Sequence, residues 1–399
     1  MYSPSNHIPS NQHLTPMLTS AAEYSSQTKD GGVFFPKPDG SGTRLVIHHQ
    51  RNGELCIYDV KTGGKSPTLI WSEKFRGDGC RFYDYGHRYA VMTNCAGIPR
   101  KNIPTVVLVI DPFACSIKHR VVIPDNGKVG GAWFGALEPN GTGRFWVAMR
   151  HKAVYVVDIL TGELVTPKGD EIAVDNNNPL TQIKFSPDGD LAAIGNGSGG
   201  VIVVNTQPPY VKRTAIRAPD ASDESDDRVY EPHGPLLEFV GRRKILVAGA
   251  KGQVCIYDLN SDARTTLTGH SDPVIGAIVA EDRLITISYD TKGVVWGPDG
   301  KVLYQVDCGI QGIVGLAVRE HGNRMVIVGV GNNGSVHVWD YHTGEHLHAH
   351  FKLAPFVTDV VFDPSGIIGL VSGSSGVITF LNMHAAVLTS TVVASASAV

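Results

Sequence analysis

Three residues close together in the sequence, His270, Ser288 and Asp290, are of the types that make a nucleophilic catalytic set. A serine hydroxyl becomes a nucleophile when a histidine accepts its proton and a carboxylate orients that histidine. Such a set is recognised by geometry and not by composition, and no GxSxG elbow occurs in the chain. The elements that hold the three residues therefore decide whether they do chemistry.

Three histidines alternate in the stretch GEHLHAHFK, at His346, His348 and His350. On a regular strand the residues i, i+2 and i+4 share one face, and such a pattern can chelate zinc. The same stretch is predicted to be the outer strand of a sheet, where polar side chains are solvated and oppose edge-to-edge pairing. The solvated-edge interpretation is favoured, so neither a metal site nor a cofactor is expected. A metal site formed by these three histidines is the alternative.

Five carboxylates crowd into the stretch PDASDESDD at 219–227. Like charges repel, so a solvated and mobile loop is the favoured interpretation. The alternative is a contact surface that attracts a basic partner over a distance. The five residues are Asp220, Asp223, Glu224, Asp226 and Asp227.

The composition is that of a folded domain, with 399 residues, 42% hydrophobic residues and a formal net charge of −3. Since no basic stripe dominates, direct nucleic-acid binding is not expected. No apolar run reaches the ~18 residues of a membrane helix, and no secretory signal or CxxC pair is present. These features predict a cytoplasmic protein, with the nucleus as the alternative, that does not bind membranes.

One sequence pattern recurs eight times: a β-rich run that ends at or beside Asp or Asn. Equivalent positions in successive runs are 39 to 53 residues apart, close to the blade period of about 40–45 residues in repeat propellers. The runs are 53–59, 105–111, 153–158, 200–205, 252–258, 293–297, 334–340 and 376–382.

Three kinds of turn keep their places within this repeat. Pro-x-Gly precedes the second strand, Asn-Gly precedes the third, as at Asn333-Gly334, and Asp-x-x-Thr-Gly follows the third, as at 158–162. Each repeat is therefore predicted to be a four-stranded antiparallel meander, and stacking these sheets around an axis would bury their faces. The prediction is an all-β propeller of eight blades, or of seven if the second repeat, with its insertion at 96–104, is not a blade.

The sixth repeat resembles the WD40 family, because it carries Gly269-His270 before its first strand and the stretch SYDTKGVVW. The resemblance implies a hydrogen-bonded structural tetrad, formed here by His270, Ser288, Asp290 and Trp296. It therefore favours a structural role over a catalytic one for the histidine, serine and aspartate. The seventh repeat keeps VHVWD at 336–340, and the other repeats lose the tryptophan.

The same resemblance implies that side chains entering the first strand of each blade form a partner-binding surface. Trp133 is the favoured contact, although a core position is the equal alternative, since aromatic residues are enriched in both places. The candidate positions are Arg81, Trp133, Gln182, His233, Asp272 and Asp359.

Residues 1–30 and 394–399 are expected to be tails around a single propeller at 31–393, in which the run at 385–393 can supply the last outer strand. The predicted function is a non-catalytic scaffold for other proteins, or a subunit of a larger assembly. The alternative is a propeller enzyme, such as a hydrolase, lyase or oxidoreductase, with its site at the mouth of the central channel.

Overall fold

The computed structural model describes most of the chain between Gly32 and Val393. The described ranges are 32–39, 41–49, 53–61, 68–75, 80–94, 104–124, 132–149, 153–166, 172–173, 180–219, 236–249, 251–307, 313–321, 324–331, 333–350, 357–362, 367–372, 377–382 and 390–393. Within them all regular structure is β-strand, and no helix of the length and apolarity that a bilayer span requires is found there.

The strands form eight antiparallel sheets, and each sheet consists of strands that are consecutive in the chain. The first contains β1 (Gly32–Pro36), β2 (Gly42–His49), β3 (Glu54–Lys61) and β4 (Thr68–Lys74). The second contains β5 (Cys80–Tyr85), β6 (Tyr89–Asn94), β7 (Val106–Asp111) and β8 (Ser116–Val122). The third contains β9 (Ala132–Leu137), β10 (Arg144–Met149), β11 (Ala153–Asp158), β12 (Glu163–Leu164) and β13 (Ile172–Ala173).

The fourth to sixth sheets follow the same meander. The fourth contains β14 (Leu180–Phe185), β15 (Leu191–Asn196), β16 (Gly200–Asn205) and β17 (Lys212–Arg217). The fifth contains β18 (Leu236–Gly241), β19 (Lys244–Ala248), β20 (Val254–Asp258) and β21 (Arg264–Leu267). The sixth contains β22 (Val274–Ala280), β23 (Arg283–Ser288), β24 (Lys292–Trp296) and β25 (Val302–Asp307).

The last two sheets complete the series. The seventh contains β26 (Ile313–His321), β27 (Arg324–Gly331), β28 (Val336–Asp340) and β29 (His346–His350). The eighth contains β30 (Val357–Phe362), β31 (Ile367–Ser372), β32 (Val377–Asn382) and β33 (Ser390–Val393). The run at 385–393 was expected to supply an outer strand, and β33 pairs with β32 in that position.

The second and third sheets differ from what the repeat pattern alone would specify. The second repeat, whose standing the sequence left open, forms the complete four-stranded sheet β5–β8. The third sheet has five strands because two short strands share its outer position. Both β12 and β13 pair with β11, at its carboxyl and amino ends respectively.

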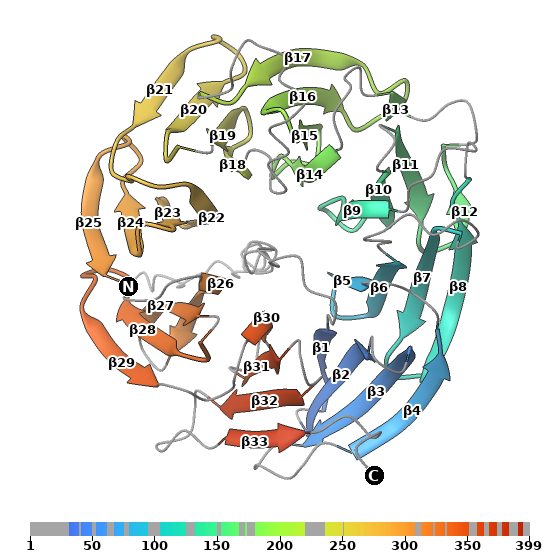
Figure 1. The fold of residues 1–399 in the computed structure, drawn as a ribbon. Coiled ribbons are helices and arrows are strands. Elements are labelled where there is room, and N and C mark those ends of the chain that lie inside the picture. The colour runs from blue at the N-terminus through green and yellow to red at the C-terminus, as the bar shows by residue number, and fades with distance from the viewer. Residues whose placement is uncertain are drawn as a thin grey trace, which may run out of the picture.

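The sheets stand side by side around a central axis, with the first strand of each sheet innermost (Figure 1). Each innermost strand contacts the next, from β1 through β5, β9, β14, β18, β22 and β26 to β30, and β30 contacts β1. The ring therefore closes between the first and last sheets. Among the described strands, no sheet mixes strands from the two ends of the chain.

The core lies between neighbouring sheets. The second and third strands of a sheet are apolar on both faces, as in Val106–Ile110 of β7, because each face packs against another sheet. One cluster joins Val107 and Val109 to Phe145, Val147 and Tyr155 of the next sheet. Full burial of each such side chain contributes about 1.5–3 kcal/mol, so the stacking is the main stabilising interaction.

The Asp-x-x-Thr-Gly turns cap the third strands in the way their residues dictate. Asp158 accepts hydrogen bonds at Oδ1 from the backbone amides of Leu160 and Thr161, and the Gly162 amide donates to the Asp158 carbonyl. Gly162 has φ = +79°, which glycine adopts without steric cost. The turn after Asp340 repeats these contacts.

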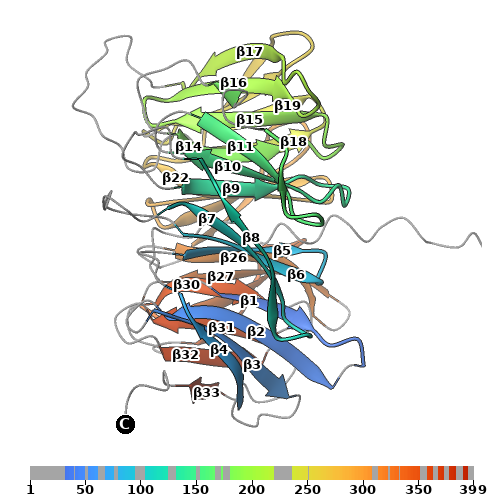
Figure 2. The ribbon, with the colours of Figure 1, turned by 90° about the vertical axis from the view of Figure 1, so that its right-hand side faces the viewer.

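The meander divides the turns between two faces of the ring (Figure 2). Turns between the second and third strands, and the connections to the next sheet, emerge on one face, which we call the upper face. Turns between the first and second strands, and between the third and fourth, emerge on the other, which we call the lower face. Every site described below belongs to one of these two faces or to the outer rim.

Candidate functional site

A buried hydrogen-bonded network sits at the upper face of the sheet β22–β25. His270 Nδ1 lies 2.9 Å from Asp290 Oδ2, and His270 Nε2 lies 2.8 Å from Thr286 Oγ1. The indole Nε1 of Trp296 donates to the same threonine oxygen over 2.8 Å. The arrangement is satisfied when the indole donates to Thr286, Thr286 donates to Nε2, and Nδ1–H donates to Asp290.

The hydroxyl of this network belongs to Thr286, whereas the sequence comparison assigned it to Ser288. Ser288 Oγ instead donates to the carbonyl of Asp272 over 2.7 Å and accepts from the amide of Asp290 at 3.1 Å. Thr286 and Ser288 lie on the same face of β23, so either could have been chosen from sequence alone. Only the distances to His270 separate them.

Burial and hydrogen bonding fix the chemistry that this network can do. The side chains of His270 and Asp290 are 0% and 3% exposed, and Thr286 is buried. Burial opposes ionisation of Asp290, but hydrogen bonds from the Lys292 amide, His270 and the Ser271 amide outweigh it and hold the Asp290 pKa below its ordinary value. The network has a structural role and not a catalytic geometry, because the Thr286 hydroxyl already makes two hydrogen bonds and is shielded from solvent.

Two exposed side chains stand on the backbone that this network braces. Asp272 is exposed, and Tyr289 is an exposed large hydrophobic residue at 47%. The Tyr289 amide donates to the Pro273 carbonyl, and the Asp272 carbonyl accepts from Ser288. A Cβ at Gly252 would come within 2.6 Å of that same Asp272 carbonyl, so the turn of the neighbouring sheet packs closely against it. The two side chains are therefore presented on a fixed backbone.

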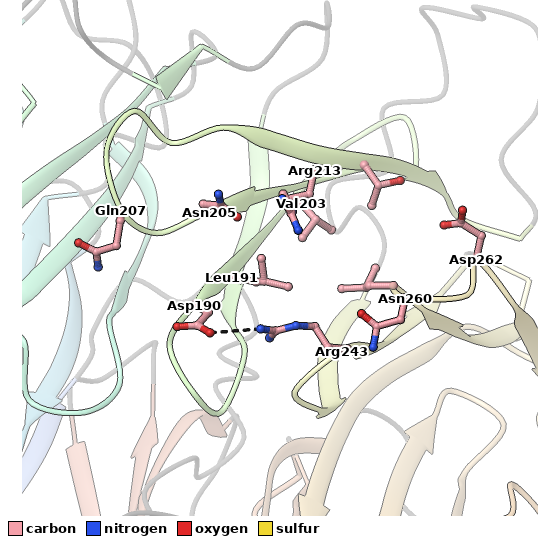
Figure 3. A pocket seen from close by; sticks show the side chains of 11 residues that line it. Asp190, Leu191, Val203, Asn205, Gln207, Arg213, Arg243, Asn260 and Asp262 are labelled. Carbon is pink, nitrogen blue, oxygen red and sulfur yellow. Dashed lines mark hydrogen bonds and ion pairs between the residues drawn. The ribbon is translucent and has the colours of Figure 1, made fainter.

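On the lower face, a polar pocket of about 540 Å³ opens between the sheets β14–β17 and β18–β21 (Figure 3). The turns of both sheets supply its walls, including Asp190 and Gln207 on one side and Asn260 on the other. The pocket exists only because two repeats meet there. No signal within a single repeat could have found it.

The charged side chains around this pocket fall into two groups. Arg243 bridges the sheets, with 3.0 Å from Nη1 to Asp188 Oδ2 and 3.1 Å from Nη2 to Asp190 Oδ2. Across the pocket in Figure 3, Arg213 and Asp262 are both exposed, and neither has an ion-pair or side-chain hydrogen-bond partner among the described residues. Among the described residues that line this pocket, Arg213 and Asp262 are thus a cation and a carboxylate available to a ligand.

Comparison with solved structures identifies the architecture. The chain is similar to the computationally designed Ika8 protein, with 17% identity, a TM-score of 0.63, and coverage of 90% of this chain and 98% of Ika8. It is also similar to the C-terminal WD40 domain of Sif2, with 12% identity, a TM-score of 0.55, and coverage of 91% of this chain and 84% of that domain. The chain has a WD40-like β-propeller fold. No family model and no curated protein sequence matches it, so the propeller is a divergent one.

In this propeller a β-bulge recurs where the innermost strand leaves the upper face. In five sheets one residue near the start of that strand has no partner on the second strand. These residues are Trp133, Thr181, Ile275, Val314 and Thr358. A bulge re-aims the side chains around it, and bulges concentrate at functional rims.

The bulges show that the predicted partner-binding positions are not all equivalent. Trp133 is itself a bulge residue, whereas Gln182 and Asp359 are one residue farther along, and Arg81 pairs regularly with Thr93. The partner-binding role of these positions stays a prediction. For Arg81, Trp133 and Asp359 the structure describes the backbone alone.

Gln182 has an observed role within the propeller. Its Oε1 accepts a hydrogen bond of 2.9 Å from the amide of Leu237, which lies in β18 of the next sheet. Below it, Lys184 forms an ion pair of 3.0 Å with Glu238 of the same strand. Gln182 therefore joins two sheets, and it is a weaker candidate for a partner contact than Asp272.

The alternating histidines do not all share a face, because His346 is turned away from the other two. Leu347 is an extra residue in β29, so that His346 opposes Trp339 while His348 opposes Val338. Because Trp339 and Val338 point to opposite faces of β28, the two histidines do as well, and the regular-strand prediction was wrong. No group of three or more metal-binding side chains was found in the described part of the chain. The side chain of His350 is not described.

The acidic stretch and one partner position lie outside the described residues. These are Asp220, Asp223, Glu224, Asp226, Asp227 and His233.

Proposed function

We propose that this chain is a non-catalytic interaction scaffold that binds other proteins through the faces of a single propeller at about residues 31–393. We infer eight blades, because eight sheets contact one another in cyclic order. WD40-like propellers are typical interaction scaffolds. Cys56, Cys115 and Cys255 form no disulfide, and Cys56 and Cys255 are buried, which supports a reducing compartment such as the cytoplasm or nucleus.

The observation that carries the proposal is the exposed pair Asp272 and Tyr289 above the buried network. An exposed tyrosine offers a large contact area with few rotatable bonds, and tyrosines are enriched among residues that dominate binding energy. Their backbone is tied by Ser288 and Asp290 before any partner arrives. Less conformational entropy is lost on binding when the contact residues are already fixed.

The lower-face pocket is the second surface that we propose. Arg213 and Asp262 can form charge-assisted contacts with opposite charges on a partner, and such contacts improve specificity and association rate more than affinity. The two surfaces lie on opposite faces of the ring. Two partners could therefore bind at the same time without competing for one surface.

Variants that alter one face at a time test this proposal. The full chain would be immobilised and exposed to native lysate as wild type, as Asp272→Ala/Tyr289→Ala, and as Arg213→Glu. Val302→Ser, on the exposed outer strand β25, is the matched control, because it removes exposed apolar area from the same sheet at the end of the strand far from the upper face and outside the lower-face pocket.

We expect a stoichiometric partner that binds wild type and Val302→Ser but not the upper-face double variant. A partner lost only from Arg213→Glu would move the binding surface to the pocket. If every variant retains the partner, both proposed surfaces are wrong. If no stoichiometric partner binds at low or physiological salt, the scaffold proposal itself is wrong.

A further inference from the structure

Neighbouring sheets meet on the lower face in a repeated way, with the outer strand of one sheet beside the turn that follows the third strand of the next. In the second, fourth and sixth sheets the outer strand has a β-bulge at the same register position. The residue directly after the bulge residue is His119, Thr214 and Tyr304, respectively. These three residues therefore occupy equivalent positions of the repeat.

In two of these interfaces a ring fills the space above the turn. A Cβ added at Gly162 would lie 2.6 Å from His119 Nδ1, and one added at Gly344 would lie 2.5 Å from Tyr304 Cδ2. Each glycine follows the last aspartate of its third strand by four residues, and each has positive φ, +79° and +76°. The ring can lie there because the turn has no side chain at that position.

Both rings also form a hydrogen bond to a backbone carbonyl of the turn. His119 Nε2 lies 3.1 Å from the Leu160 carbonyl oxygen, and since a carbonyl only accepts, that nitrogen carries the proton. The Tyr304 hydroxyl donates to the Tyr341 carbonyl. The space above the turn is thus suited to a flat group that donates hydrogen bonds.

Two further interfaces are filled by apolar side chains. Trp71, at the equivalent position of the first sheet, packs in one cluster with Cys115 from the turn of the second sheet. Between the fifth and sixth sheets, Leu267 Cδ2 lies 3.1 Å from the place of a Cβ at Gly300. Side chains of the chain itself therefore occupy the space above the turn in all four of these interfaces.

The interface between the fourth and fifth sheets differs at both positions. Thr214 has no ring, and the turn carries Asp262 four residues after Asp258, where the third sheet has Gly162 four residues after Asp158. Asp262 keeps the left-handed conformation, with φ = +55°, which aspartate tolerates. The lower-face pocket of about 540 Å³ lies here, lined by both residues (Figure 3).

The turn offers hydrogen-bond acceptors to whatever enters this pocket. Leu259 and Asn260, which line it, correspond to Tyr341 and Leu160, whose carbonyls accept from the rings in the other interfaces. Asp262 adds a carboxylate. A guanidinium group suits these acceptors, because it is flat, positively charged and has five N–H donors, two of which can bind one carboxylate.

We propose that this pocket holds the side chain of an arginine from the partner protein, in the place that a ring of this chain fills in two other interfaces. The inference rests on the proposed function, since it names the partner chemistry of the lower-face surface. Arg243 in the pocket wall is already paired with Asp188 and Asp190. Arg213 is left to pair with a carboxylate. The recognised segment therefore carries an acidic residue beside its arginine.

Calorimetric titration of the full chain with the peptide acetyl-Gly-Arg-Glu-Gly-amide tests the proposal. The same peptide with citrulline or lysine in place of arginine serves for comparison. Citrulline keeps the flat shape of the arginine side chain but has no charge. Lysine keeps the charge as a compact ammonium group without the planar set of donors.

Three variants locate the binding. Asp262→Gly removes the carboxylate and installs the residue that the equivalent position has at Gly162, so the turn is expected to fold. Thr214→His/Asp262→Gly also rebuilds the ring, as in the pair of His119 and Gly162. Asp282→Ala is the matched control, because its side chain is a 72% exposed carboxylate on the lower face outside the pocket.

We expect wild type and Asp282→Ala to bind the arginine peptide at millimolar concentration, and the citrulline and lysine peptides at least about tenfold more weakly. Asp262→Gly should bind the arginine peptide at least about tenfold more weakly than wild type does. The double variant should not bind it, and should melt no lower than wild type. Equal affinity for the arginine and citrulline peptides, or wild-type affinity in Asp262→Gly, would overturn the proposal.

This inference and the scaffold proposal can fail separately. If the arginine peptide does not bind while a lysate partner is still lost from Arg213→Glu, the arginine inference is wrong and the scaffold proposal stands. If the peptide binds through Asp262 but no lysate partner is found, the pocket is a guanidinium site and the scaffold proposal is wrong.

Discussion

The Thr286 hydroxyl lies 2.8 Å from the indole nitrogen of Trp296 and equally close to a ring nitrogen of His270. One small side chain thus connects two adjacent strands, β23 and β24, to the segment that enters the sheet β22–β25. Because all three groups are buried, removal of the hydroxyl would leave two nitrogens without a partner. An unsatisfied buried polar group costs about 1–3 kcal/mol.

Thr286→Val should therefore destabilise the propeller more than Ser288→Ala. We expect a loss of about 2–3 kcal/mol in the free energy of unfolding for Thr286→Val, and of about 1 kcal/mol for Ser288→Ala, which removes contacts to Asp272 and Asp290 only. Urea unfolding measures both. A larger loss for Ser288→Ala would restore the serine as the central hydroxyl.

Glu138 should make stability depend on pH. It is 4% exposed, and burial raises its pKa despite hydrogen bonds from Trp146 Nε1 and Thr142 Oγ1. Since the folded pKa lies above the unfolded value, the folded state holds this proton more tightly. The resulting stabilisation is fully present below the unfolded pKa of about 4.3 and is lost as pH rises through the folded pKa.

Thermal unfolding of wild type and Glu138→Gln across this window measures the effect. Glutamine can still accept from Trp146, but it does not titrate. We expect the melting temperature of wild type, relative to Glu138→Gln, to fall as pH rises from about 4 to 7. A difference between the two proteins that does not change with pH would contradict the prediction.

Gly252→Ala should disturb the upper face from a neighbouring sheet. Gly252 has φ = +78°, and a Cβ there would lie 2.6 Å from the Asp272 carbonyl oxygen. We expect a loss of about 1–3 kcal/mol in the free energy of unfolding, together with weaker partner binding, because Asp272 must move.

Gly241→Ala is the matched control in the same sheet. A Cβ at Gly241 meets no atom within 4 Å, and its φ lies outside the left-handed range. Urea unfolding should therefore show little change for this variant. Similar losses for the two variants would mean that the contact with Asp272 has no effect of its own.

The repeated architecture was predictable because its signals are local. The run at 252–258 contains β20, and the Asn333-Gly334 pair precedes β28, with Gly334 at φ = +76°. Alternation, strand-forming residues and turn residues act within a few positions of one another. They specify a meander before any sheet packs on another.

The contacts between sheets were not predictable in the same way. Gln182 bonds to Leu237 across 55 positions, and Arg243 reaches Asp188 across a similar span. The bulge at Leu347 carries no residue signature either, since Leu is common in regular strands. The lower-face pocket depends on contacts between sheets, and the orientation of His346 depends on the bulge. Neither feature can be recognised before the three-dimensional arrangement of the sheets is known.

The closure of the ring has a consequence for how this chain can be cut and rejoined. In many closed assemblies the two ends of a chain share a sheet, and separating them would break backbone hydrogen bonds. Here the described strands of the first and last sheets stay separate, and β1 meets β30 only through packing between sheets. A circular permutant that opens the chain between any two sheets would therefore keep every sheet intact. Under mechanical load we expect the ring to open first between β30 and β1, because those two sheets are held together by packing.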